Sequence, residues 1–156
     1  NLEVGRICGH DGAIVGGGER EGKKLIDSFL ANTPALKTLR QKVDRLAKRG
    51  WLPSLDGRRL MVRSAHAALN VLLQGAGAVV MKQALIHLTD ELKSCKILGS
   101  FVANVHDEWQ IETSKEFAES VGQAGVQAIQ QAGLTLGLRC PLDGEYKIGS
   151  NWATTH

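Results

Sequence analysis

An α+β fold is predicted for this 156-residue chain, with long helices, short antiparallel hairpins and a strand near the C-terminus. Apolar residues recur every three or four positions in several segments, as they do on the buried face of a helix. Two pairs of short apolar runs enclose polar turns, as they do in hairpins. The chain is 43% hydrophobic and 22% charged, which is the composition of a globular domain and excludes a disordered chain.

The first third of the chain is predicted to be helical after a glycine-rich loop at residues 1–18. A helix is predicted over residues 19–30, and Asn32-Thr33-Pro34 ends it. The proline also suits the first turn of a second helix, because an N–H group there would have no helical partner. We expect this second helix to reach Arg49, where a glycine closes it.

A small hairpin is predicted over residues 51–62. Its two apolar runs flank a polar segment in which Asp56-Gly57 is a strong turn signal. Arg58 and Arg59 follow directly, so we expect both guanidinium groups to project from the tip of the hairpin.

A long helix is predicted from a cap at Ser64 to about Leu92. Within it His66, Asn70 and Gln74 recur at every fourth position, so they share one stripe of an otherwise apolar helix. Donors and acceptors in such a row need partners. Two interpretations stay open from the pattern alone: the stripe binds a ligand, or its members are hydrogen-bonded groups of the core.

A membrane-spanning role is also considered for this helix, because residues 64–81 contain no Asp, Glu, Lys or Arg. The same stretch holds His66, Asn70, Gln74 and two glycines, which a bilayer core penalises. We therefore expect no membrane partner.

The last third of the chain is predicted to pair two strands, at residues 101–105 and 109–112, around a charged bend. Thr113 and Glu116 have the spacing of a capping box, which predicts a helix that lasts until Gly133. A final strand is predicted over residues 138–146.

Positive charge is concentrated in one part of the sequence. Residues 37–63 carry a net charge of +7, whereas the rest of the chain carries −4. Such a block suits a polyanion such as nucleic acid, because each neutralised phosphate releases counterions. The alternative is an ordinary solvated helix face. The basic residues are Lys37, Arg40, Lys42, Arg45, Lys48, Arg49, Arg58, Arg59 and Arg63.

The charged bend, His106-Asp107-Glu108, places two carboxylates side by side. Neighbouring carboxylates repel one another and are stabilised by a divalent cation, so a Mg²⁺ site is the functional interpretation. An ordinary charged hairpin tip is the alternative. Together with the basic block and the polar stripe, the bend favours phosphoryl transfer on a nucleic acid.

The order of these segments resembles the C-terminal part of family A DNA polymerases, and most closely their podovirus replicative branch. The likeness covers residues 12–156 and rests on five segments: 29–34, 55–59, 63–70 with Gln74-Gly75, 105–108, and the terminal Gly149-Ser150-Asn151-Trp152-Ala153. The fold that it implies is part of a polymerase fingers and palm, with residues 1–63 fingers-like and residues 64–156 supplying the palm segment.

The resemblance also implies roles for individual residues. Asp107 matches the aspartate of motif C, which binds the catalytic metal ions, with Glu108 as its acidic neighbour and His106 near the primer terminus. The helix stripe matches positions that contact the minor groove, where the acceptors are nearly the same for every base pair. The implied DNA-binding residues are His66, Asn70, Gln74, Arg58, Arg59 and Arg63.

Two parts of the family pattern have no counterpart in this sequence. These are the second metal-binding aspartate, from motif A, and the fingers helix that grips the incoming nucleotide. We therefore expect a two-metal Mg²⁺ site completed by another chain, with primer-template DNA, a dNTP and the remaining polymerase segment carrying motifs A and B as partners. The alternative is a non-catalytic primer-template DNA-binding fragment or a polymerase accessory subunit. A third interpretation is a helical domain whose polar stripe is core.

A cytoplasmic location is expected, in the host cell if the chain is encoded by a phage. Its three cysteines lie far apart and no secretory signal precedes them, which suits a reducing compartment.

Overall fold

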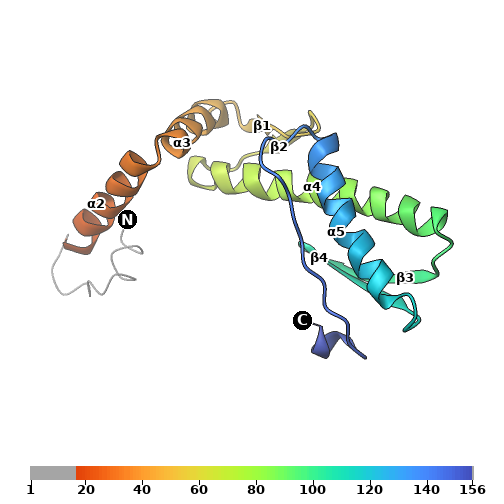
Figure 1. The fold of residues 1–156 in the computed structure, drawn as a ribbon. Helices are drawn as coiled ribbons and strands as arrows, with labels where there is room; N and C mark the ends of the chain where they lie inside the picture. The colour runs from red at the N-terminus through yellow and green to blue at the C-terminus, as the bar shows by residue number, and fades with distance from the viewer. Residues whose placement is uncertain (1–16, 156) are drawn as a thin grey trace. The chain divides into compact units, whose positions relative to one another are not determined.

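The structure, a computed structural model, describes residues 17–155 (Figure 1). The chain divides into two compact units. The first unit holds the chain up to Leu52 together with Val62–Leu69. The second holds Pro53–Met61 and the chain from Asn70 onward. Most of the predicted N-terminal loop lies outside the described residues, and the predicted division into fingers-like and palm segments at residue 63 stays a prediction.

Two consecutive helices of the first unit confirm the helical periodicity of the N-terminal third. Helix α2 spans Gly17–Asn32 and helix α3 spans Pro34–Ala47. They are separated by Thr33, whose hydroxyl donates to the Phe29 carbonyl at 2.7 Å, and Pro34 begins α3 as expected. Helix α3 ends at Ala47, two residues before its predicted end at Arg49.

A short hairpin follows, with strands β1 (Trp51–Pro53) and β2 (Arg59–Met61). Its turn is closed by a backbone hydrogen bond of 2.8 Å from Ser54 to Arg58. Gly57 has a φ of +81°, a conformation that costs glycine little. The turn predicted from Asp56-Gly57 is therefore confirmed.

Helix α4 spans Ala65–Ser94 and is the longest element of the described chain. The Ser64 hydroxyl accepts a hydrogen bond from the Ala67 amide at 3.3 Å, so the predicted cap is confirmed. Against Gly75 lies Leu60 of the hairpin, whose Cδ1 would be 2.7 Å from an added Cβ. By length and composition alone α4 could cross a membrane, a criterion that core helices also meet.

Strands β3 (Gly99–Val105) and β4 (Glu108–Thr113) form an antiparallel hairpin with a two-residue turn. The register is interrupted once: Phe101 pairs with Ile111, but Ala103 pairs with Gln110. Val102, between them, is the extra residue of a β-bulge. The predicted hairpin is confirmed, with strands slightly longer than expected.

Helix α5 spans Ala118–Thr135, but the capping box predicted before it is wrong. The residue at the cap position is Phe117, which provides no side-chain cap. Thr113 instead ends β4, and its hydroxyl donates to the Leu98 carbonyl at 2.7 Å across the base of the hairpin. Glu116 accepts a hydrogen bond from the Ser114 hydroxyl at 3.3 Å.

The core of the second unit joins α4, α5 and the β3–β4 hairpin. Its centre consists of aliphatic side chains from one face of each helix, and aromatic and aliphatic side chains of the hairpin and its flanks pack against them. The buried residues are Leu88, Leu92, Val121, Ala124 and Ala128, and the residues packed against them are Ile97, Trp109, Ile111 and Phe117.

The strand predicted for residues 138–146 is wrong, because these residues form no strand. They run beside α5 (dark blue in Figure 1) as an irregular segment, in which Leu142 packs on Gly133 and Tyr146 packs on Gly122. Their apolar side chains are therefore used against a helix, and Pro141 has no N–H for a ladder. The segment then enters a short 3₁₀ helix, η1 (Trp152–Thr154).

Candidate functional site

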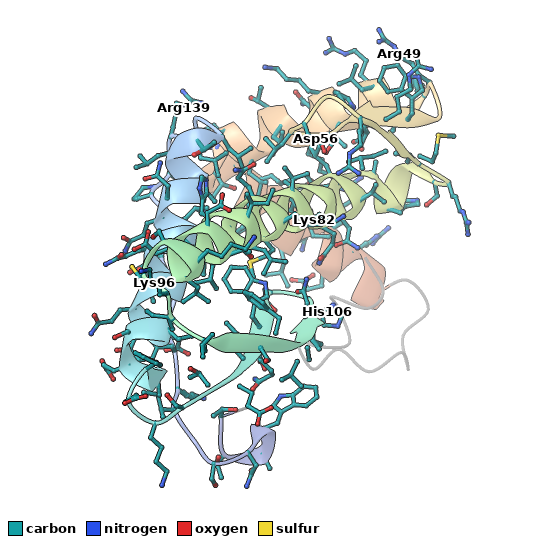
Figure 2. All side chains as sticks on the ribbon, turned by 90° about the vertical axis from the view of Figure 1, so that its right-hand side faces the viewer. Arg49, Asp56, Lys82, Lys96, His106 and Arg139 are labelled. Atoms are coloured by element: carbon teal, nitrogen blue, oxygen red, sulfur yellow. The ribbon has the colours of Figure 1, made fainter. Side chains whose placement is uncertain are left out.

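The turn between β3 and β4 consists of His106 and Asp107, which confirms that the charged bend is the tip of a hairpin. Both side chains are exposed, and His106 lies at the end of the hairpin in Figure 2. The backbone of His106 has a φ of +54°, in the left-handed region. Turns of two residues favour glycine or asparagine there, so a histidine at this position carries strain on the order of 1 kcal/mol.

The third residue of the bend, Glu108, is the first residue of β4 and is half-buried. Alternation along the strand places Glu108 and Gln110 on one face, opposite Trp109 and Ile111, which pack on the core. The Gln110 side-chain amide donates to Glu108 Oε1. Sequence reasoning missed Gln110, although its spacing of two residues from Glu108 on a predicted strand was a usable signal.

The donor atoms at this tip fit a Mg²⁺ ion. Mg²⁺ prefers oxygen ligands and commonly takes one or two carboxylates from a protein, with water and substrate phosphate in the other positions. Asp107 and Glu108 supply two carboxylates on consecutive residues. Within residues 17–155, no group of three His, Cys, Asp or Glu side chains gathers to hold a metal ion by itself.

The polar stripe of α4 is exposed at all three positions, His66, Asn70 and Gln74. The interpretation that these are hydrogen-bonded core groups is therefore wrong. The apolar residues that fix the helix to the core of the second unit, Leu88 and Leu92, lie further along it. The stripe is thus available to a ligand.

The basic block is also exposed, at all nine of its lysines and arginines. Within it Arg58 is partly neutralised, because its Nε donates to Asp56 Oδ2 at 2.5 Å and its backbone N–H to Oδ1 at 3.3 Å. Desolvation would raise the pKa of Asp56, but it is outweighed by hydrogen bonds, among them those from Arg58, and this pKa lies below its ordinary value. An exposed pair of this kind is weak, so a phosphate can compete for the guanidinium.

The predicted site residues therefore lie in four places. His106, Asp107 and Glu108 come together in one hairpin, the polar stripe lies along one helix, and Arg58 and Arg59 lie beside one turn. Arg63 lies between β2 and α4.

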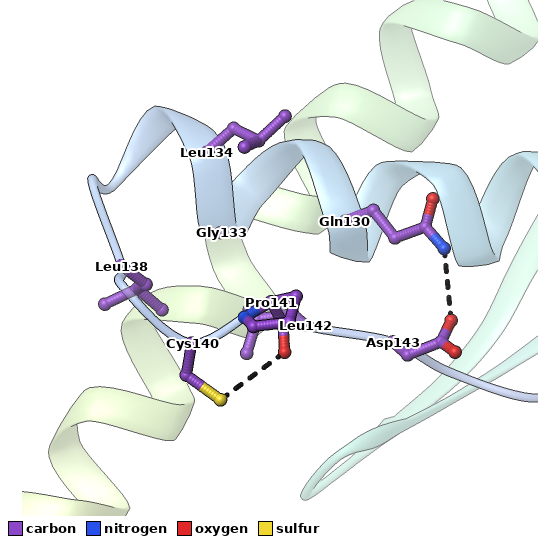
Figure 3. Close-up of a pocket in the computed structure, with 8 residues that line it drawn as sticks. All are labelled: Gln130, Gly133, Leu134, Leu138, Cys140, Pro141, Leu142 and Asp143. Carbon is purple, nitrogen blue, oxygen red and sulfur yellow. Dashed lines mark hydrogen bonds between the residues drawn. The ribbon is translucent and has the colours of Figure 1, made fainter.

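A cavity of about 380 Å³ lies at the C-terminal end of α5, and no predicted site residue lines it (Figure 3). Its wall is mostly apolar and includes Leu134, Leu138 and Leu142. A hydrogen bond of 3.1 Å from Gln130 to Asp143 crosses from the helix to the C-terminal segment beside it. The cavity reflects how residues 138–143 pack on α5.

Comparison with known proteins shows the family of the chain. The family model for DNA polymerase family A matches residues 14–154. The chain is 39% identical to the DNA-directed DNA polymerase of Escherichia phage T7, over 93% of this chain and 24% of that protein. It is 29% identical to DNA polymerase I of Bacillus caldotenax, over 85% of this chain and 16% of that protein.

A solved structure shares the fold. It is described as the POL domain of Pol1 from M. smegmatis in complex with DNA primer-template and dNTP. The TM-score is 0.64 at 23% identity, over 72% of this chain and 22% of that chain. The chain thus spans about a quarter or less of the proteins it matches. Since the family model covers nearly all of it, the chain belongs to DNA polymerase family A.

Proposed function

We propose that this chain is the C-terminal part of a DNA-directed DNA polymerase and supplies motif C to its active site. The observation that carries the proposal is the β3–β4 turn, which exposes Asp107 and sets Glu108 beside it in a chain of this family. The reaction is template-dependent nucleotidyl transfer. The remaining polymerase segment, with motifs A and B, completes the site.

Asp107 and Glu108 are proposed to hold Mg²⁺, and the second metal-binding aspartate comes from the remaining polymerase segment. When bound, a pair of Mg²⁺ ions stabilises the charge on the attacking and leaving oxygens of an in-line displacement. Asp107 lies at the exposed tip of a hairpin whose strand β4 packs against the core through Trp109 and Ile111. The carboxylate is thereby presented on a rigid support, as positioning of reactants requires.

The substrates are a primer-template DNA and a dNTP, which are the molecules named for the related POL domain structure. The primer 3′ oxygen forms a bond to the α-phosphorus of the nucleotide, and the bond from that phosphorus to pyrophosphate breaks. His106 would lie near the primer terminus. Its exposed side chain at the turn suits that role.

The duplex would be held by the two other groups of residues. The exposed stripe of His66, Asn70 and Gln74 suits the minor groove, where its donors and acceptors can test base-pair geometry without reading sequence. Arg58, Arg59 and Arg63 suit the phosphate backbone.

The test is primer extension in Mg²⁺ by the complete polymerase with Asp107→Asn. The variant keeps the shape of the side chain but removes its charge, and we expect extension to fall roughly a thousandfold, because a metal ligand contributes several kcal/mol to the transition state. Primer-template affinity should change little. Asp56→Asn, the same change in the other hairpin, is the matched control and should extend at close to the normal rate.

The competing function is a primer-template binding fragment or accessory subunit without a catalytic part. The exposure of all nine basic residues is the observation that favours it. Normal extension by the Asp107→Asn polymerase would establish this alternative and overturn the catalytic proposal.

A further inference from the structure

We propose that Gln110 and Thr155 are positioning residues that hold the Glu108 carboxylate in one orientation. The inference rests on the proposed function of Glu108. It starts from the two ends of the Gln110 side-chain amide. Its nitrogen donates to Glu108 Oε1, and its oxygen accepts from the Thr155 hydroxyl at 3.2 Å.

The orientation of this amide is fixed by its neighbours. A carboxylate can only accept a hydrogen bond, so the NH₂ group of Gln110 must face Glu108. The amide oxygen then faces the Thr155 hydroxyl, whose single proton it shares with the Trp152 carbonyl at 3.1 Å. Thr155 is the only one of these groups with a proton to give to the amide oxygen. The three side chains thus form one directed series, from Thr155 through Gln110 to Glu108.

Thr155 is itself held in place. The Asn151 side chain caps η1 by accepting from the Thr154 amide at 3.2 Å, which fixes the turn that carries Thr155. Upstream, Tyr146 packs on Gly122 of α5 and its hydroxyl donates to Glu119. The C-terminal segment is therefore fastened to α5 before it reaches β4, and Thr155 can act as an anchor 45 residues away from Gln110 in sequence.

Such an anchor has a chemical purpose. A carboxylate on a surface strand turns freely about its side-chain bonds, and ordering it costs entropy at the moment a cation binds. Groups that hydrogen-bond to metal-binding side chains commonly change metal affinity 10- to 100-fold when they are removed. Gln110 and Thr155 would set the orientation of Glu108 in advance.

The experiment compares Thr155→Val, Thr155→Ser and Thr113→Val in the complete polymerase. Thr155→Val keeps the shape but removes the hydroxyl, and we expect the Mg²⁺ concentration for half-maximal extension to rise about tenfold with the KM for dNTP unchanged. Thr155→Ser restores the hydroxyl and should restore the normal value. Thr113→Val removes a hydroxyl of the same hairpin that bonds only to the Leu98 carbonyl, and it should leave the Mg²⁺ dependence unchanged.

A second measurement avoids turnover: titration of Mn²⁺ into the polymerase without dNTP, followed by electron paramagnetic resonance. We expect a higher dissociation constant for Mn²⁺ in Thr155→Val and Gln110→Ala, and an unchanged one in Thr113→Val. An unchanged Mg²⁺ midpoint and unchanged Mn²⁺ affinity in Thr155→Val would overturn the inference. If Asp107→Asn still abolishes extension in that case, the proposed function stands and only the positioning role fails.

Discussion

The turns of the two hairpins differ in length and in charge, but each contains one residue in the left-handed region. In the β1–β2 turn the left-handed position is taken by Gly57, and the neighbouring Arg58 is tied back to Asp56. In the β3–β4 turn the left-handed position is taken by His106, and Asp107 follows it exposed. One turn is relaxed and basic, and the other is strained and acidic.

The two turns differ in what accounts for their backbone conformation. A glycine at a left-handed position costs little, so the β1–β2 turn can be explained by folding alone. A histidine there costs folding energy, as does Lys96 after α4, which has the same φ of +54°. Whether the strain at His106 serves the proposed site is what the His106→Gly variant below tests.

The largest difference that we predict between the two turns concerns DNA affinity. The double variant Arg58→Ala/Arg59→Ala removes two proposed phosphate contacts, so the slope of log affinity against log salt should decrease by about 2. Between 50 mM and 200 mM salt, the DNA affinity of the wild type should therefore fall about tenfold more than that of the double variant. Fluorescence anisotropy with a labelled primer-template measures both quantities.

The matched control for this prediction is Lys93→Ala/Lys115→Ala, which removes two exposed lysines outside the basic block. The control should keep the normal salt slope. Equal slopes for the two double variants would show that the charge near the β1–β2 turn is an ordinary solvated surface.

A smaller effect concerns stability and has opposite signs in the two turns. Gly57→Ala places a Cβ on a left-handed residue and should destabilise the chain by about 1 kcal/mol. His106→Gly relieves the same strain and should stabilise it by about 0.5 kcal/mol, after the larger entropy of the unfolded glycine is subtracted. Urea unfolding of both variants measures the two changes.

The outcome for His106 has a second part. If the strain serves the site, His106→Gly should slow primer extension by the complete polymerase while it raises stability. A variant that is both more stable and fully active would break the argument that the turn is kept strained for its chemistry.

The smallest predicted effect is a pH dependence of the unfolding free energy, caused by Tyr146 in the C-terminal segment. The hydrogen bond from Tyr146 to Glu119 raises the pKa of Tyr146 above its ordinary value of 10.0, since ionisation would remove the proton that the bond needs. A raised pKa means that the stabilisation is complete below pH 10 and is lost as the pH rises through the value in the folded chain.

Tyr146→Phe keeps the ring on Gly122 and removes the hydroxyl, so it provides the reference. The difference in unfolding free energy between the wild type and this variant should be constant from pH 7 to 9 and should shrink above pH 10. A difference that stays constant up to pH 11 would exclude the proposed bond.

Most helices and both hairpins could be predicted from the sequence, because apolar spacing and, in the first hairpin, the Asp56-Gly57 turn act locally. The capping box at Thr113 failed for a tertiary reason: the hydroxyl bonds to Leu98 across the hairpin, which no local pattern indicates. The strand at residues 138–146 failed because its apolar residues pack on glycines of α5.

The candidate site, too, could be predicted only where its signal is local in the sequence. The residues of the turn and of the helix stripe could be chosen from their spacing and from the family resemblance. The link from Gln110 to Thr155 could not, because it joins residues 45 positions apart and depends on how the C-terminal segment is fastened. The left-handed backbone of His106 was equally hidden, since histidine is not a residue that signals such a turn.

The extra residue at Val102 changes which side chains of β3 share a face of the β3–β4 hairpin. A shift of one residue turns every later side chain of a strand to the opposite face. Because the bulge absorbs one such shift, Phe101 can share the inward face of Ile111 while Val105 shares the outward face of Glu108. Deletion of Val102 would therefore leave a regular ladder with the same pairs. An insertion or deletion between Val102 and the turn would instead shift the register and turn the side chains near the tip to the opposite face.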